Sequence, residues 1–284
     1  MTIHKSLSVV AGALMLLASL GTAGVAGAAT SVQIKGSDTM VHLASAWAEK
    51  FMQENSGIEV SVTGGGSGTG IAALINGTTD IATSSRLIQP SEINAAKSRG
   101  FTPHEISAGK DGIAVIVNPS NPIKSLSMDQ IKKIFTGEVN NWKAFGGPNQ
   151  KIVVYTRDSS SGTFQFFQEH VLNKNDYSVR ARRLPSNSAI VQSVADSAGS
   201  IGYVGLGYLA DAQGKAQALT VKKNDSSPAV APSIATVSDG TYPISRDLLL
   251  YTKGEPTGAV KTFVDFMLGS EGQQIVEEMG FVKK

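Results

Sequence analysis

The sequence contains no cysteine among its 284 residues. This absence excludes disulfide bonds, thiol nucleophiles and cysteine-ligated zinc or iron–sulfur sites. Histidine is scarce as well, and the four that occur are scattered: His4, His42, His104 and His170. No two of them have the spacing of a metal-binding pair. We therefore expect no metal site in this protein.

Charge is also sparse. Charged residues make up 17% of the chain and the formal net charge is +2 at pH 7. This net charge is too small to indicate a nucleic acid or another acidic polymer as a partner. Hydrophobic residues make up 41%, which is typical of a folded chain and excludes wholesale disorder. The length allows one large domain or two smaller ones, each with its own core.

The N-terminus has the three parts of a secretory signal. Lys5 supplies a positive charge, an apolar run follows over residues 7–20, and the small residues 26–28 read Ala-Gly-Ala. We predict that residues 1–28 are a cleaved signal peptide. The alternative is a membrane anchor, because residues 7–29 are just long enough to span a bilayer. No cysteine is available for a lipid anchor, so we expect a free protein in the periplasm.

After this segment, strand-like and helix-like patterns alternate. We expect strands at residues 32–35, 59–63, 80–83, 112–117, 151–155, 200–204 and 246–253. We expect helices at residues 40–55, 71–76, 90–99, 128–135, 164–172, 189–197, 258–268 and 270–279. This alternation predicts an α/β fold with helices on both faces of a sheet. Residues 211–240 are polar, and we interpret them as an irregular connection.

Four loops share one design: each follows a strand, precedes a helix and is rich in Ser, Thr or Gly. They are residues 36–39, 64–70, 84–86 and 157–163. Helix N-termini attract anions, and hydroxyl groups add donors without adding charge. The carboxyl ends of strands meet at one edge of a sheet, so these loops predict a cage for a small oxyanion. Arg157 would bind two of its oxygens through the guanidinium fork. For any one loop, the alternative is a simple turn with an N-cap.

Two catalytic motifs are absent from these loops. The glycine-rich loop at residues 64–70 has no lysine, which a nucleotide-binding phosphate loop requires. The residues around Ser67 and Ser161 do not fit the Gly-x-Ser-x-Gly frame of a serine hydrolase. We therefore expect no cofactor and no catalytic residue.

Several motifs in combination resemble one known family. They are GSDT at residues 36–39, TGGGSGTGIAALINGTTDIATSSR at 63–86, IFTGEVNNW at 134–142, TRDSSSGT at 156–163 and GSIGYVGLGY at 199–208. The sequence resembles the periplasmic phosphate-binding proteins of phosphate ABC importers. The resemblance implies a two-lobed fold of the type II periplasmic-binding-protein class, with a ligand cleft between the lobes and two crossover strands near residues 109–114 and 242–249. Lobe 1 would be residues 29–110 plus 240–284, and lobe 2 would be residues 111–239.

The resemblance also implies the ligand, the partners and the site. Inorganic phosphate would bind in the cleft of a monomer, which would deliver it to the permease and ATPase subunits of the importer. The implied ligand-binding residues are Ser37, Asp38, Thr39, Ser67, Ser85, Arg86, Arg157, Ser161, Gly162 and Thr163.

One position departs from the family pattern. Many members have an aspartate that accepts the proton of bound phosphate where this chain has Ser85, followed by Arg86. We hypothesise that Asp38 takes over as the proton acceptor and that Arg86 becomes a second cationic contact. For Arg86 the alternative is a salt bridge that holds the cleft loops.

Other functions stay open at this point. One is a receptor for another oxyanion such as sulfate, molybdate or a phosphonate. A second is a secreted phosphatase. A third is a sensory or adhesive module built on the same fold, because a fold does not fix a function.

Overall fold

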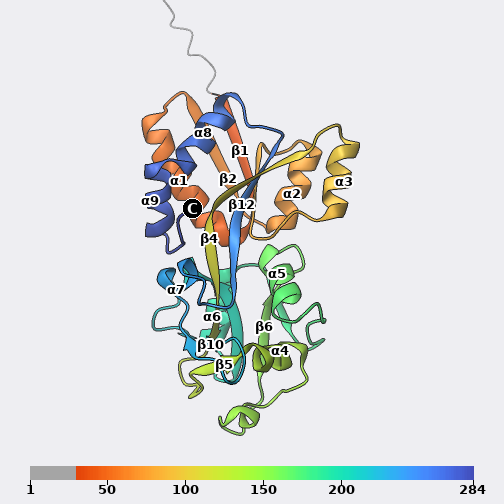
Figure 1. Cartoon of the computed structure of the whole chain (residues 1–284), viewed down its shortest axis with the longest axis vertical. Helices are drawn as coiled ribbons and strands as arrows, with labels where there is room; N and C mark the ends of the chain where they lie inside the picture. Colours follow the sequence, from red (N-terminus) through yellow and green to blue (C-terminus); the bar gives the residue numbers. More distant parts are fainter. Residues whose placement is uncertain (1–29) are drawn as a thin grey trace, which may run out of the picture.

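The computed structural model describes residues 30–284 (Figure 1). The predicted signal peptide, residues 1–28, lies outside the described residues. From residue 30 onward, no helix is long and apolar enough to cross a membrane.

The chain alternates between strands and helices, as expected from its sequence. The strands are β1 (Thr30–Gly36), β2 (Ile58–Thr63), β3 (Ile81–Ser84), β4 (Pro103–Val117), β5 (Ser125–Ser127), β6 (Val153–Arg157), β7 (Arg182–Leu184), β8 (Ser200–Gly205), β9 (Gln217–Ala218), β10 (Thr220–Lys222), β11 (Ala229–Val230) and β12 (Ser245–Lys253). The α-helices are α1 (Val41–Glu54), α2 (Ser67–Asn76), α3 (Pro90–Ser98), α4 (Met128–Thr136), α5 (Gly162–His170), α6 (Asn187–Ala195), α7 (Ile234–Ser238), α8 (Gly258–Leu268) and α9 (Ser270–Glu278). Three short 3₁₀ helices are η1 (Asp38–Met40), η2 (Trp142–Phe145) and η3 (Leu206–Tyr208).

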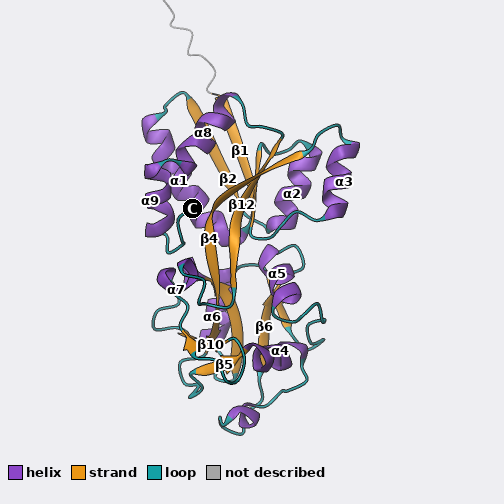
Figure 2. Ribbon diagram, in the orientation of Figure 1, coloured by secondary structure: helices purple, strands orange, loops and turns teal. Residues whose placement is uncertain are grey.

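Most strands belong to one mixed sheet that runs through both lobes. Its order is β2-β1-β3-β12-β4-β8-β6-β7, with β9 paired to β4. A smaller sheet has the order β11-β10-β5. In the upper lobe of Figure 2, α1, α8 and α9 lie on one side of the sheet, and α2 and α3 lie on the other. The predicted α/β class with helices on both faces is confirmed.

The strands β4 and β12 connect the two lobes (Figure 1). The first part of β4 pairs antiparallel with β12, from Pro103 opposite Lys253 to Gly112 opposite Ser245. Its second part, from Ile113, pairs with β8. One long strand therefore belongs to both lobes, which confirms the two-lobed fold. The exact lobe boundaries at residues 110 and 240 stay a prediction.

Each lobe has its own apolar core. The core of lobe 1 gathers side chains from β1, α1, the first half of β4, β12 and α8, with Trp47 and Phe263 fully buried. The core of lobe 2 includes Trp142, Phe167 and Tyr203. The rings of Phe167 and Tyr203 stack with their centroids 4.2 Å apart. Because the two cores are separate, the residues between them are free to form a cleft.

Capping residues set the starts of the helices that border the cleft. The Ser161 hydroxyl accepts a hydrogen bond from the Phe164 backbone N–H and so begins α5. At α3, Gln89 and Glu92 form a reciprocal capping box around Pro90. These local signals place the N-terminal turns of both helices next to the loops selected from the sequence.

Three sequence expectations are wrong in detail. Residues 211–240 are not purely irregular, because they contain β9, β10, β11 and α7. The strand expected at residues 112–117 begins at Pro103, since pairing with β12 extends it through a polar stretch. The helix expected at residues 71–76 begins at Ser67, so the second half of the glycine-rich loop is helical.

Candidate functional site: a buried hydroxyl and guanidinium cage

Buried hydroxyl groups from both lobes meet where the four loops converge. The Ser37 hydroxyl donates to Ser85 Oγ over 3.0 Å, and Ser67 Oγ lies 3.3 Å from Ser85 Oγ. Thr39 Oγ1 lies 2.9 Å from Thr163 Oγ1 across the two lobes. All five residues are at most 2% exposed. Such a set of uncharged donors in a dry site is suited to an anion.

Glycine allows the backbones of this cage to approach closely. Gly36 ends β1 with φ of +150°, and a Cβ there would overlap the Thr83 carbonyl oxygen. This close approach lets the Ser37 N–H donate to the Thr83 carbonyl over 2.9 Å. In the same way, a Cβ on Gly162 would overlap Ser67 Oγ. Gly36 thus brings the loop after β1 against the end of β3, and Gly162 brings the loop after β6 against the start of α2.

Arg157 lies beside the cage and is 1% exposed. Its Nη2 donates to the Pro185 carbonyl over 2.8 Å. Its Nη1 lies 3.1 Å from Asp38 Oδ2, which makes an ion pair across the lobes. Among residues 30–284, no atom accepts a hydrogen bond from Nε or Nη1. A buried guanidinium with free donors is expected to bind an anion, because unpaired buried donors are costly.

Asp38 is the carboxylate that pairs with Arg157. The neighbouring carboxylate, Asp158, instead accepts hydrogen bonds from Ser160 within its own loop. Asp38 Oδ2 also accepts from the backbone N–H of Asn187 over 2.9 Å and from its side-chain amide over 2.6 Å. Asp38 belongs to lobe 1 and Asn187 opens α6 in lobe 2, so this cluster ties the two lobes together.

The two lobes are closed over the cage. The Gly68 N–H donates to the Ser160 carbonyl over 3.0 Å, and the Ser160 hydroxyl donates to the Gly65 carbonyl over 3.1 Å. Further out, the Gln89 amide donates to Gln165 Oε1 over 2.8 Å. Each bond joins the loops around α2 and α3 to the loop and first turns of α5. A ligand in this cage would contact both lobes at once.

Arg86 lies at the edge of the cage with its charge paired inside lobe 1. Its Nη1 and Nη2 donate to the two carboxylate oxygens of Glu92 over 2.8 and 2.7 Å. Its Nη1 also donates to the Leu87 carbonyl. This bidentate pair is the salt bridge that the sequence analysis kept as the alternative to a direct anion contact. It links the loop after β3 to the first turn of α3.

A third buried arginine, absent from the predicted site, lies in the crossover strands. Arg246 of β12 stands opposite Asp111 of β4 in the strand register. Its Nη2 donates to Asp111 Oδ2 over 2.8 Å, and both side chains are at most 2% exposed. Complete burial raises the pKa of the Asp111 carboxyl, and the adjacent guanidinium opposes this rise. Sequence reasoning missed the pair because 135 residues separate its members.

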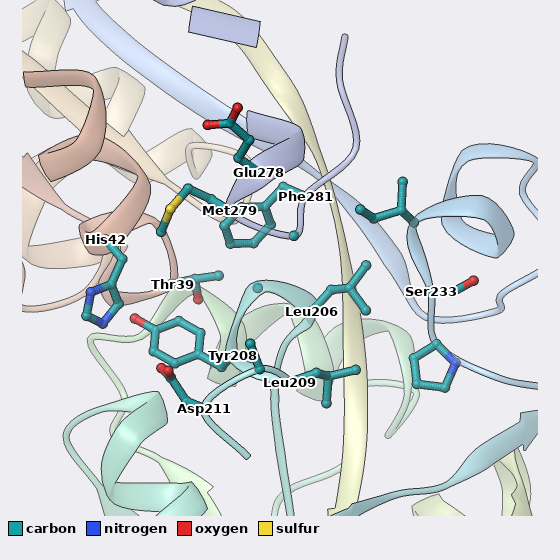
Figure 3. Close-up of a pocket in the computed structure, with 15 residues that line it drawn as sticks. Thr39, His42, Leu206, Tyr208, Leu209, Asp211, Ser233, Glu278, Met279 and Phe281 are labelled. Carbon is teal, nitrogen blue, oxygen red and sulfur yellow. The ribbon is translucent and has the colours of Figure 1, made fainter. Parts of the chain in front are cut away.

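A separate cavity of about 540 Å³ lies between the lobes, with Thr39 in its wall (Figure 3). His42 and Tyr208 lie together on one wall, and Met279 and Phe281 lie on another. Thr39 is the one predicted site residue that lines it, and no Arg or Lys of the described chain does so. This cavity therefore lacks the cations that an oxyanion site needs. Among residues 30–284, no three His, Cys, Asp or Glu residues lie close enough to hold a metal ion.

The closed lobes, the crossover strands and the interlobe cage define a solute-binding protein of the two-lobed periplasmic class. A family model described as the PBP superfamily domain matches residues 21–271. The chain belongs to the PBP superfamily.

Named relatives and solved structures show which proteins of this superfamily the chain resembles. The chain is 36% identical over 256 residues to a protein of Bacillus subtilis named phosphate-binding protein PstS, covering 90% of this chain and 81% of that one. A solved structure from Clostridium perfringens, described as a putative phosphate ABC transporter substrate-binding protein with bound phosphate, matches with a TM-score of 0.81 at 32% identity. That match covers 90% of this chain and 100% of the other. An ABC-type phosphate transport receptor from Vibrio cholerae matches with a TM-score of 0.72 at 28% identity, covering 89% and 100%.

Proposed function

We propose that this protein is a non-enzymatic receptor that captures inorganic phosphate in the interlobe cage and delivers it to an ABC importer. The observation that carries this proposal is Arg157, a buried guanidinium whose Nε and Nη1 donate no hydrogen bond within the described chain, beside hydroxyl groups from both lobes. Its Nη1 has only the ion pair with Asp38. A bound oxyanion would accept from those nitrogens and from the hydroxyls. Since its contacts come from both lobes, binding would favour the closed state over the open one. The names of the relatives support phosphate as the oxyanion.

Each predicted ligand-binding residue receives a role in this proposal. Ser37, Thr39, Ser67 and Ser85 supply lobe 1 hydroxyls. The N-terminal turn of α5 supplies donors from lobe 2 through Gly162 and Thr163. Ser161 caps that helix, which aims its first N–H groups at the cleft. We assign Arg86 a positioning role, because both of its terminal nitrogens donate to Glu92 and only its Nε donates to no acceptor in the described chain.

Asp38 is proposed to accept the proton of bound phosphate. Sulfate has no such proton at neutral pH, so its oxygen would meet a carboxylate without a hydrogen bond between them.

The deciding experiment is calorimetric titration of the mature chain, freed of bound phosphate, with phosphate and then sulfate. One-to-one phosphate binding with no heat from sulfate is the expected result. Binding of both anions, or preference for sulfate, would overturn phosphate as the specific ligand. Turnover of a chromogenic phosphate ester would instead favour the phosphatase alternative.

The role of Asp38 is tested with Asp38→Asn in the same assay. We expect weaker phosphate binding together with a smaller gap between phosphate and sulfate. If both anions lose affinity equally, Asp38 serves only to hold the lobes together through Arg157 and Asn187.

The remaining parts of the proposal concern the cellular context. We propose that the protein is exported by its signal peptide, carries no lipid anchor and acts in the periplasm as a monomer. Its partners would be the permease and ATPase subunits of the importer. Loss of phosphate uptake on deletion of the protein would support this role over a sensory or adhesive one.

A further inference from the structure

The Asp111–Arg246 pair occupies the point where the two crossover strands pass between the lobes. Asp111 Oδ1 accepts from the backbone N–H of Leu206 over 2.9 Å, which fixes the chain just after β8 in lobe 2. Arg246 Nη1 donates to the Ser85 carbonyl over 2.9 Å, which fixes the loop after β3 in lobe 1. The pair therefore holds one loop of each lobe in place.

The same guanidinium contacts the two threonine hydroxyls of the cage. One of the two Arg246 Nη2 hydrogens points to Asp111, and the other is shared between Thr163 Oγ1 at 3.0 Å and Thr39 Oγ1 at 3.3 Å. These two hydroxyls come from different lobes and lie 2.9 Å apart. Arg246 is thus a cation that contacts hydroxyl oxygens of both lobes in the closed state.

Arg246 differs from Arg157 in how its nitrogens are used. Its Nε donates to Asp111 Oδ2 over 3.1 Å, so each of its three nitrogens already has an acceptor within the protein. Arg157, in contrast, has two nitrogens without a hydrogen-bond acceptor among the described residues. Arg157 is therefore suited to bind the anion, and Arg246 is suited to organise the groups around it.

A hydroxyl can donate or accept, and its neighbours decide which it does. The Nη2 hydrogen that Arg246 shares between the oxygens of Thr39 and Thr163 occupies one lone pair on each oxygen. One threonine proton can then bridge the two oxygens, and the other is directed toward the remaining acceptor in the cage. A fixed donor stabilises an anion more than a freely rotating hydroxyl, because no reorganisation is needed on binding.

We propose that Asp111 and Arg246 are positioning residues of the anion site, which orient the Thr39 and Thr163 hydroxyls as donors to the bound anion when the lobes close. This inference rests on the proposed function. Asp111 holds the guanidinium in register, and Arg246 acts through the threonine hydroxyls without contacting the ligand.

The test is a double-mutant cycle between Arg246 and Thr163, read out by calorimetric titration with inorganic phosphate. The first variant is Asp111→Asn/Arg246→Met, which removes both charges together and so avoids an unpaired buried charge. We expect phosphate affinity to fall by about tenfold, the size of one hydrogen bond to a charged group. In a Thr163→Val background, we expect the same replacement to change affinity by less than about threefold, since the group it acts through is gone.

A conservative variant keeps the test decisive if the double substitution does not fold. Arg246→Lys retains the charge and three N–H donors, so we expect an affinity between those of the wild type and the neutral variant. Arg99→Gln, a change at an exposed arginine that bonds to Asn76, is the matched control and should bind as wild type does.

Three results would contradict the inference: equal losses in the wild-type and Thr163→Val backgrounds, no loss at all, or Arg246→Lys binding no better than the neutral variant. The wild-type titration is run first. Failure of the unmodified protein to bind phosphate would overturn the proposed function, whereas wild-type binding with additive losses overturns only this inference.

Discussion

Replacing Gly162 with alanine should impair closure of the cleft without lowering the stability of the fold. Gly162 is the first residue of α5, and its φ lies outside the left-handed region, so an alanine fits the backbone. Alanine is a better helix former than glycine by up to about 1 kcal/mol. We therefore expect the ligand-free Gly162→Ala protein to melt at or slightly above the wild-type temperature.

The same methyl group would block the cage. The added Cβ would overlap Ser67 Oγ and would lie 2.8 Å from Ser85 Oγ, both across the cleft in lobe 1. Closure would then fail to bring these two hydroxyls to the anion. A hydrogen bond to a charged group contributes about 1.5–3 kcal/mol, so loss of two costs about 3–6 kcal/mol. This corresponds to roughly a hundredfold to ten-thousandfold weaker phosphate binding.

Calorimetric titration with phosphate and thermal unfolding of the ligand-free protein measure the two effects. Gly57→Ala is the matched control, because a Cβ at that position meets nothing within 4 Å and needs no unusual backbone. A Gly162→Ala protein that binds phosphate within about threefold of wild type, under 1 kcal/mol, would refute the cage as the binding site. A large loss of ligand-free stability would refute the reasoning about the helix.

Two further predictions follow from Arg157 and from the buried tyrosines. The Arg157→Lys substitution replaces a guanidinium, which can bind two oxygens of the anion, with an ammonium group. Titration should show phosphate affinity lower by about ten- to a hundredfold. Unchanged affinity would show that Arg157 does not belong to the site. Burial raises the pKa of five tyrosines, so their contribution to stability is complete below the ordinary value of about 10 and is lost as pH rises above it. Chemical unfolding should therefore show that the free energy of unfolding falls above about pH 10. In a pH titration, the tyrosinate absorbance of the folded protein should rise at higher pH than that of the unfolded chain. Equal absorbance of the two states at each pH would contradict this prediction. These residues are Tyr177, Tyr203, Tyr208, Tyr242 and Tyr251.

Sequence reasoning reached the loops of the site because their signals are local. A strand-like run that leads into Gly, Ser or Thr and then into a helix-like run indicates where the strand ends. This pattern can be recognised without knowing the rest of the chain. In this way the structure joins the hydroxyls of Ser37, Ser67 and Ser85 and pairs Thr39 with Thr163. The charge of Arg157 likewise stood out beside a serine-rich loop.

Other features depend on partners far away in the sequence. The polar first half of β4 becomes a strand because β12 pairs with it, and that pairing also sets Arg246 against Asp111. Arg86 could contact either an anion or a carboxylate until the capping turn of α3 placed Glu92 within 2.7 Å. No local pattern predicts such a choice, because it depends on which groups the fold brings together.

By itself, the amino-acid sequence determined the alternation of strands and helices, the positions of the glycine and hydroxyl loops, and the small net charge that argues against a polymeric partner. Tertiary structure alone decided which charges pair: Asp38 with Arg157 across the lobes, Arg86 within lobe 1, and Arg246 with Asp111 at the crossover. The physical reason is the range of each effect. Backbone preferences and capping act over a few residues, whereas burial and ion pairing depend on distances that exist only after the lobes have folded and closed.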